Sequence, residues 1–241
     1  MDTSFWIQCN PKLTVEHTTK KYFGKYLYKL VVYCPAGRLI DSKGAMDKAL
    51  EHRKMVSKQI NYGGYWGQRN NRDLDQADTA FLDVMRDVRQ DPAGIKLRVE
   101  EPRVQIYAAT EQELINLTNT RFVPFKHYVE SFAGPGDAKA EAVLNSGAII
   151  RKVDIGYKYK VILRDGRYDS EVKQQLLRYL NNLGPDEVRV SKTGLDMLAK
   201  PTSYVWNLYL YVNDLSVTTF INLISPGIVS NSHELVIASH K

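Results

Sequence analysis

The sequence has few of the residues from which crosslinked or metal-built folds are made. Cysteine occurs only twice in 241 residues, as Cys9 and Cys34. Two cysteines cannot complete a structural zinc site by themselves, although one disulfide between them is conceivable. The simplest expectation is two free thiols in a reducing compartment.

Long hydrophobic runs are also missing. The longest uncharged apolar runs, such as Val31–Cys34, fall far short of the roughly 20 residues that a membrane-spanning helix needs. The start of the chain, Met1–Phe5, lacks a basic segment followed by an apolar core, so it does not resemble a secretory signal. We therefore expect a cytoplasmic protein without a membrane partner.

Motifs that carry known catalytic chemistry are absent. The five histidines form neither a His-x-His nor a His-Glu-x-x-His pattern, and the chain has no Gly-x-Ser-x-Gly, Walker or dinucleotide-binding motif. Cys34 with a distant histidine could form a nucleophile pair, but any chain with both residues allows that. The sequence therefore predicts no catalytic residue, no metal ligand and no cofactor, and a non-enzymatic role is favoured over an enzymatic one.

One cluster of carboxylates could still converge on metal ions, as in two-metal nucleases. Its members follow one another around a predicted helix: Asp73, Asp75, Asp78, Asp83 and Asp87. The apolar face of that helix is supplied by other residues, so the favoured interpretation is a solvated acidic face.

The composition that is present is that of a globular protein. Apolar residues make up 44% of the chain and charged residues 25%, and the length fits one large domain or two small ones. The net charge of +6 is unevenly distributed, because residues 12–72 hold 13 Lys or Arg against 4 Asp or Glu. Either this segment folds against acidic ones or it forms a basic face for phosphate or an acidic partner.

The chain repeats one order of predicted elements. In the first half, strand 26–33, helix 42–59, loop 61–72 and helix 75–90 precede strands 96–100 and 103–109, helix 111–119 and strand 121–132. The second half has strand 157–163, helix 169–183, strand 187–190, a helical turn at 192–200, strand 204–212, helix 214–224 and strand 233–238. Thr110 and Glu113 form a capping-box pattern at the start of helix 111–119.

This order predicts an α+β fold of two tandem ferredoxin-like (β-α-β-β-α-β) repeats. The first repeat covers residues 1–132, with an N-terminal extension and an insertion at 61–90 that adds a loop and a helix. The small and turn-forming residues of 133–150 suggest a linker, and the second repeat covers 151–241.

Aromatic residues recur on the predicted strands. By strand alternation we expect a shared face for each of three tyrosine pairs: Tyr26 and Tyr28, Tyr157 and Tyr159, and Tyr209 and Tyr211. An open aromatic sheet face is where RNA-recognition modules stack bases, but the glycine-containing signature of their third strand is absent here. The alternative is that these tyrosines are core or interface residues.

Two segments combine basic and aromatic residues in a way that suits nucleic acid. The first interleaves lysines with Tyr22, Phe23, Tyr26 and Tyr28, and the second is a glycine-rich loop with aromatic and arginine residues. The candidate nucleic-acid-binding residues are Lys20, Lys21, Lys25, Lys29, Tyr62, Tyr65, Trp66, Arg69 and Arg72. The alternatives are lysines that protect a strand edge and a loop that packs on its own domain or on another subunit.

The sequence therefore favours a non-enzymatic protein that binds single-stranded nucleic acid or RNA with little sequence preference. The alternative is a structural or assembly subunit of a viral or other multi-protein particle. In that case the tyrosine-rich strands and the glycine-aromatic loop would be protein–protein contacts, and the protein could be an oligomer.

Overall fold

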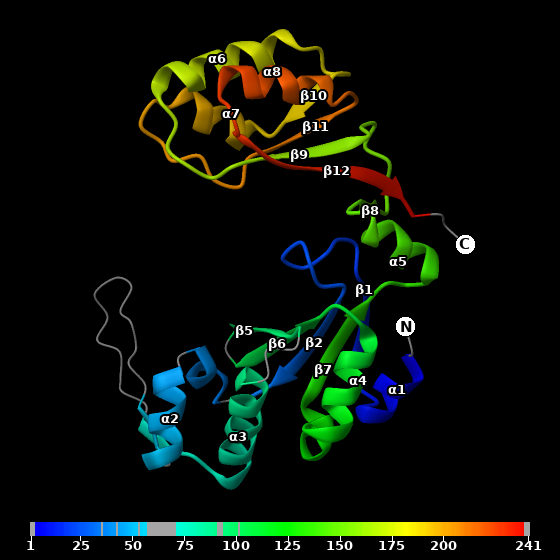
Figure 1. The fold of residues 1–241 in the computed structure, drawn as a ribbon, viewed down its shortest axis with the longest axis vertical. Coiled ribbons are helices and arrows are strands. Elements are labelled where there is room, and N and C mark those ends of the chain that lie inside the picture. The colour runs from blue at the N-terminus through cyan, green and yellow to red at the C-terminus, as the bar shows by residue number, and fades with distance from the viewer. Residues whose placement is uncertain are drawn as a thin grey trace. The chain divides into compact units, whose positions relative to one another are not determined.

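The computed structural model describes residues 3–34, 36–41, 43–52, 54–56, 71–90, 94–100 and 102–238. It is a mixed α+β structure with two five-stranded sheets (Figure 1). The chain divides into two compact units, Met1–Glu141 (unit 1) and Ala142–Lys241 (unit 2). No helix within the described residues is long and apolar enough to cross a membrane.

Unit 1 is built on a sheet with the strand order β1-β7-β2-β6-β5. Its strands are β1 (Thr14–His17), β2 (Tyr28–Tyr33), β5 (Lys96–Glu100), β6 (Arg103–Ala108) and β7 (Val129–Gly134). Its helices are α1 (Thr3–Cys9), η1 (Gly37–Asp41), α2 (Lys43–His52), α3 (Gln76–Gln90), α4 (Glu111–Thr120) and η2 (Val123–Tyr128). A separate two-stranded ladder joins β3 (Lys54–Val56) to β4 (Asn71–Asp73).

The helices of unit 1 cover one face of this sheet. Alternate residues of the central strands, such as Leu30 of β2 and Ile106 of β6, are fully buried, as is Leu114 of α4. Trp6 of α1 stacks on Phe132 of β7 at a ring-centroid distance of 4.2 Å. The core therefore lies between the sheet and the helices, and the other sheet face carries charged residues such as Lys29 and Arg103 together with Tyr107.

Unit 2 has the corresponding strand order, β8-β12-β9-β11-β10. Its strands are β8 (Ile149–Arg151), β9 (Tyr159–Leu163), β10 (Val188–Val190), β11 (Tyr209–Val212) and β12 (Val229–Ile237). Helices α6 (Ser170–Asn182), α7 (Lys192–Ala199) and α8 (Ser216–Ile224) complete it, and α5 (Ala138–Asn145) spans the boundary between the units.

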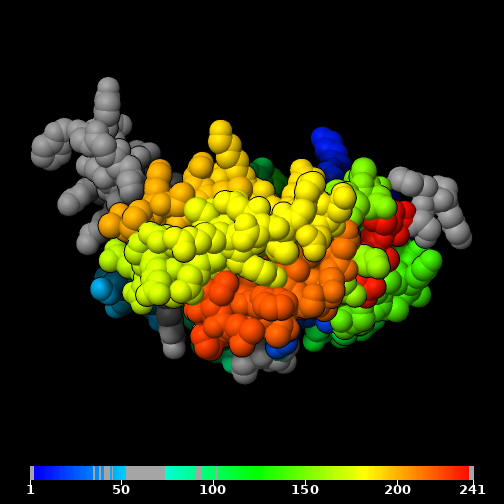
Figure 2. Space-filling model, turned by 90° about the horizontal axis from the view of Figure 1, so that it is seen from above, coloured from blue at the N-terminus to red at the C-terminus, as the bar shows by residue number. Residues whose placement is uncertain are grey.

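A single apolar core joins the sheet of unit 2 to its helices. Val161, Leu210 and Val212 from the sheet pack with Leu176 of α6 and Ile221 of α8. Figure 2 looks onto the helix side of this unit, where α6 (yellow-green) and α8 (orange-red) lie side by side. The helices cover one face of the sheet, as in unit 1 (Figure 1).

The structure confirms several predicted elements, including α3, β5, α4 and α6 to within one or two residues. The capping box at Thr110 is confirmed, with the Glu113 backbone N–H donating to the Thr110 hydroxyl and the Thr110 N–H donating to the Glu113 carboxylate. Helices with strong local signals were thus well predicted.

Other expectations were wrong in their extent. The predicted helix 42–59 ends at His52 and is followed by β3. The predicted strand 121–132 is a 3-10 helix, η2, followed by β7, because the aromatic residues Phe122 and Phe125 pack against Phe81 of α3 instead of entering a strand. The segment 133–150, expected as a linker, holds the boundary between the two units after Glu141, and it contains α5 and the first two residues of β8.

Two edge strands were not predicted. β1 pairs in parallel with β7, and β8 pairs in parallel with β12, each at the outer edge of its sheet. Both are short, with four and three residues, and these residues are exposed or half-buried, so neither strand is long enough to show a clear alternating pattern.

Candidate nucleic-acid interface

A row of cationic and aromatic residues crosses the sheet face of unit 2 that its helices leave uncovered. Lys160 of β9 is in register with Tyr211 of β11 on one side and with His233 of β12 on the other, and Arg189 of β10 faces Tyr211. We call these four residues the unit 2 row. Their strand neighbours, such as Val161, point into the core, so the row lies on the opposite face.

Tyrosine rings surround the centre of this row. Tyr209 meets Tyr211 edge-on at 5.5 Å between centroids, and Tyr157 lies against Tyr211 at 6.2 Å with an interplanar angle of 29°. The ammonium group of Lys160 sits 3.8 Å from the centroid of the Tyr209 ring. All three tyrosines are half-buried, so part of each ring remains accessible. The face therefore offers flat aromatic surface next to positive charge.

The charges on this face are mainly positive. Arg189 is exposed and makes no ion pair with any residue that the structure describes. Glu234 is in register with Tyr159, whose ring packs on the core, so its carboxylate leaves the strand on the opposite side from His233. An anion approaching the row therefore meets cations from two strands.

His233 is held in a defined orientation. Its Nδ1 lies 2.7 Å from the carbonyl oxygen of Gly147, so Nδ1 carries the proton and donates to that oxygen. Nε2 is then an acceptor in the neutral ring and becomes a second donor when the ring is protonated.

Hydrogen bonds fix the segment that carries Tyr157. The amide Nδ2 of Asn213 donates to the carbonyls of Gly156 and Asp186, and its Oδ1 accepts from the N–H of Lys158. The Tyr157 hydroxyl also donates to the Pro185 carbonyl. These contacts tie the residues before β9 to those before β10 and hold the Tyr157 ring beside Tyr211.

Unit 1 has a row of similar composition, with Ala133 in the place of His233, but it is covered. Tyr107 of β6 is in register with Lys29 of β2 and Lys96 of β5. Tyr22 and Phe23 pack on Tyr107 at centroid distances of 5.2 and 5.0 Å. As a result Tyr107 is only 3% exposed.

Elsewhere on that face of unit 1, arginines form ion pairs with glutamates. Arg103 donates to Glu130 at 2.5 Å, and Arg98 pairs with Glu100 at 2.7 Å. A shallow hollow of about 510 Å³ lies beside the Arg103–Glu130 pair. On this face of unit 1, Lys29, Arg98 and Arg103 thus each lie close to a carboxylate.

The structure places four of the candidate residues named from the sequence. Lys20 and Lys25 are exposed, Lys21 is half-buried, and Lys29 lies on the sheet face, 3.8 Å from a carboxylate oxygen of Glu16. Four others, Tyr62, Tyr65, Trp66 and Arg69, lie outside the described residues. Arg72 belongs to β4, and nothing is described of its side chain.

Simple strand alternation gave the wrong faces for two tyrosine pairs. Tyr26 contacts Tyr107 on the uncovered face, whereas Tyr28 faces Phe132 in the core. Likewise Tyr157 lies beside Tyr211, whereas Tyr159 packs on the core. In both cases the first tyrosine precedes the strand, where the period of two does not apply.

Arg189, Lys160 and His233 were not identified as site residues from the sequence. They are separated by up to 73 positions in the chain, and only strand pairing brings them together. The sequence does show basic residues on tyrosine-rich strands. This pattern could have indicated the site only if the register between the strands had been known.

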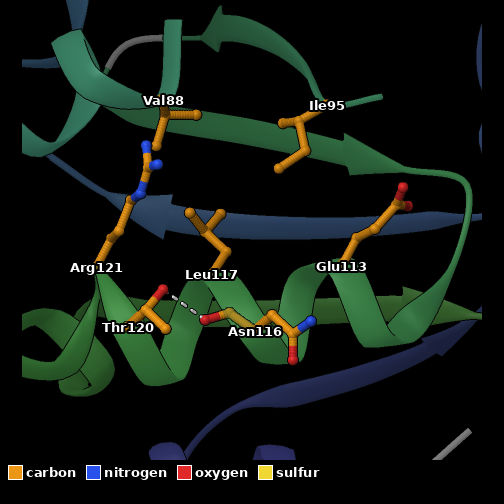
Figure 3. Close-up of a pocket in the computed structure, with 7 residues that line it drawn as sticks. All are labelled: Val88, Ile95, Glu113, Asn116, Leu117, Thr120 and Arg121. Atoms are coloured by element: carbon orange, nitrogen blue, oxygen red, sulfur yellow. Dashed lines mark hydrogen bonds between the residues drawn. The ribbon is translucent and has the colours of Figure 1, made fainter. Parts of the chain in front are cut away.

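A further hollow lies in unit 1. It has a volume of about 250 Å³ and lies between α3 and α4, with Glu113 and Arg121 at its two ends and Val88, Ile95 and Leu117 between them (Figure 3). The Glu113 carboxylate is already engaged in the cap of α4.

The acidic helix is not the uniformly solvated face that was expected. Asp78 is 6% exposed, and its N–H donates to the Asp75 carboxylate at 2.7 Å, which caps the start of α3. Asp83 pairs with Arg86. Among the residues that the structure describes, no group of three or more His, Cys, Asp or Glu is placed to hold a metal ion.

Comparison of the chain with models of known protein families, with curated proteins and with solved structures finds no match in any of the three. The functional interpretation therefore rests on the geometry of the site.

Proposed function

We propose that this protein binds single-stranded nucleic acid on the uncovered sheet face of unit 2. The observation that carries the proposal is the unit 2 row, in which Arg189, Tyr211, Lys160 and His233 lie side by side across four strands. Stacking on aromatic rings together with phosphate contacts from Lys and Arg is the usual basis of such binding.

The fold supports this proposal. We propose that each unit is a ferredoxin-like repeat, since β2, β5, β6 and β7 lie in the order fourth-first-third-second, and β9 to β12 do the same. In such a unit the helices occupy one face of the sheet and leave the other for a ligand. Unit 2 has tyrosines and cations on that face, whereas unit 1 covers its own.

Little sequence preference is expected. Stacking tolerates every base because each has a π-face, and the row offers phosphate donors rather than a set of paired amides for base edges. The exposed Lys20 and Lys25 and the glycine-aromatic loop with Trp66 and Arg69 remain proposed as additional contacts, as the sequence suggested.

The direct test is salt-dependent binding of a fluorescein-labelled single-stranded oligonucleotide, measured by fluorescence polarisation. Lys160→Gln and Arg189→Gln should each weaken binding, and each should reduce the slope of log K against log salt by about 0.7. Lys192→Gln is the matched control, because it removes one exposed positive charge from α7, on the other side of the same unit. An absence of binding by the wild type, or equal losses in all three variants, would refute the proposal.

One observation favours the alternative function as an assembly subunit. Phe220 is 53% exposed and Leu223 is 73% exposed on α8, and Tyr179 of α6 lies 5.7 Å from the Phe220 ring. Exposed apolar side chains that lie together are typical of protein contacts. If this patch joins subunits, Phe220→Ser with Leu223→Ser should lower the mass measured by light scattering and leave oligonucleotide binding unchanged.

A further inference from the structure

The strand registers place the two units in residue-by-residue correspondence on their uncovered faces. In each unit a tyrosine lies two positions before the central strand, β2 or β9, and a lysine lies on that strand. A tyrosine of the neighbouring strand, β6 or β11, pairs with the lysine, and a cation of the edge strand next to it, β5 or β10, pairs with that tyrosine. The matching residues are Tyr26 and Tyr157, Lys29 and Lys160, Tyr107 and Tyr211, and Lys96 and Arg189. The two sheets therefore share one construction on this face.

The ring contacts repeat as well. Tyr26 lies 6.4 Å from Tyr107 with an interplanar angle of 40°. Tyr157 lies 6.2 Å from Tyr211 at 29°. The correspondence thus holds in space and not only in register.

The two units differ in what lies next to Tyr107 in unit 1 and next to Tyr211 in unit 2. In unit 1 the ring of Phe23 meets Tyr107 edge-on at 5.0 Å, and the Lys96 ammonium lies 4.4 Å from the Phe23 centroid. Phe23 is thus held between an aromatic ring and a cation. We call this position the ring seat of unit 1.

The backbone of unit 1 is bent to deliver Phe23 to this seat. Tyr22 and Tyr26 are bridged by backbone hydrogen bonds, and between them Phe23 has φ +52° and Gly24 φ +69°. A bulky residue in the left-handed region is strained, and such strain persists only where the surroundings hold it. The contacts with Tyr107 and Lys96 are what hold Phe23 there.

Unit 2 has no counterpart of Phe23. By the correspondence of Tyr26 with Tyr157, the position of Phe23 falls at Asp154, an exposed residue whose carboxylate accepts a hydrogen bond from the N–H of Gly156 at 2.8 Å. The ring contacts of Tyr211 in the described structure come from Tyr157 and Tyr209 alone. Tyr211 stays partly exposed and Arg189 is exposed, whereas Tyr107 is buried.

We infer that the position between Tyr211 and Arg189 takes one planar aromatic ring, an unpaired nucleobase, in the place that Phe23 takes in unit 1. The inference rests on the proposed function and specifies where a base would bind. A base stacked inside a duplex presents only its edges, so the seat selects single strands. Unit 1 contributes no such seat because Phe23 occupies it.

The first experiment uses an oligonucleotide in which a single 2-aminopurine is flanked by abasic sites, next to a fully abasic strand of equal length. The base should raise affinity over the abasic strand, and its fluorescence should be quenched on binding. Tyr211→Leu should remove that advantage, a loss of roughly 5- to 150-fold. Tyr204→Leu, which changes a tyrosine 49% exposed outside the row, is the control and should bind as wild type does.

The outcomes separate the two proposals. If the 2-aminopurine oligonucleotide, the abasic oligonucleotide and an unmodified oligonucleotide all fail to bind, the proposed function is refuted, and this inference with it. Equal binding of the abasic and base-containing strands, or an unchanged Tyr211→Leu variant, would refute the ring seat while leaving phosphate-mediated binding in place.

A second experiment tests the correspondence with unit 1. Phe23→Gly removes a side chain that is 54% exposed and places glycine at a positive φ, so the fold should be retained. The variant should bind two 2-aminopurine probes per chain instead of one. Adding Tyr107→Leu to Phe23→Gly should return the stoichiometry to one. A stoichiometry that stays at one would refute the equivalence of the two seats.

Discussion

Lys173 on α6 is a buried cation that pairs with no carboxylate among the residues that the structure describes, and its removal tests what holds unit 2 together. Its side chain is 1% exposed. Its ammonium donates to the carbonyls of Lys200 at 2.9 Å and Pro201 at 3.2 Å, to the hydroxyl of Ser203 at 3.1 Å and to the Ser203 carbonyl. The amine therefore gathers the backbone that follows α7 and anchors it to α6.

The effect of Lys173→Met follows from these bonds. Methionine keeps most of the side-chain volume but removes a donor from three carbonyls. The Lys200 carbonyl keeps the hydroxyl and the N–H of Ser203 as donors, so the Pro201 and Ser203 carbonyls are the ones that lose this partner, and each unsatisfied buried acceptor costs about 1–3 kcal/mol. Two terms reduce the loss: Ser203 is half-buried, so water can reach part of the site, and burial of the charge itself is unfavourable, which lowers the pKa of Lys173. We expect a net loss of about 2–4 kcal/mol in the free energy of unfolding.

Urea denaturation followed by far-ultraviolet circular dichroism measures this loss. With a slope of about 1–3 kcal/mol per molar, the midpoint should fall by roughly 1–2 M. Lys200→Met is the control, since it deletes an exposed amine while keeping the carbonyl that Lys173 binds, and it should change stability by less than about 0.5 kcal/mol. A Lys173→Met protein as stable as wild type would show that these hydrogen bonds contribute no net stability.

Three further predictions concern other parts of the chain. Gly194→Ala should destabilise by about 1–3 kcal/mol in thermal melts, because the new methyl would lie 2.5 Å from a buried Leu208 carbon, whereas Gly44→Ala, with nothing within 4 Å, should be neutral or stabilising. Burial and nearby carboxylates raise the pKa of Tyr28 to about 12, so the neutral form of its phenol favours the folded state. This stabilisation is complete below pH 10 and is lost as the pH rises from about 10 to about 12. Tyr28→Phe should therefore reduce the fall of the denaturation midpoint over that pH range. Asn213→Ala should weaken oligonucleotide binding in polarisation assays because it releases the segment that holds the Tyr157 ring, and unchanged affinity would show that this segment is fixed by other contacts.

Local sequence signals were sufficient for the helices. The apolar spacing of α3 and α6 and the Thr110 capping box are properties of short segments, and the structure agrees with them. The pattern failed at residues 121–132, where a local run of aromatic and β-branched residues looks like a strand. There the long-range contact of Phe122 with Phe81 favours a 3-10 helix.

For the candidate site too, the sequence indicated the kinds of residue, whereas long-range contacts decided which of them are exposed. The sequence indicated basic and aromatic residues as the binding chemistry and nucleic acid as the partner, and both remain proposals. Its lysine candidates lie in unit 1, where Lys29 is near the Glu16 carboxylate and Phe23 covers Tyr107. Neither fact is visible in the sequence, because the first depends on a contact between β1 and β2 and the second on a contact between the turn at Phe23 and β6.

What the sequence by itself determined is the mixed α+β composition, the order of most helices and strands, and the presence of cations among tyrosines. These follow from periodicity and capping, which act over a few residues. The tertiary structure alone decided which residues share a face. Strand pairing set the register that joins Arg189, Tyr211 and Lys160, and the turn at Phe23 covered the matching row of unit 1. A one-residue change of register would send every side chain of a strand to the opposite face, so exposure of the proposed site depends on pairing between distant segments.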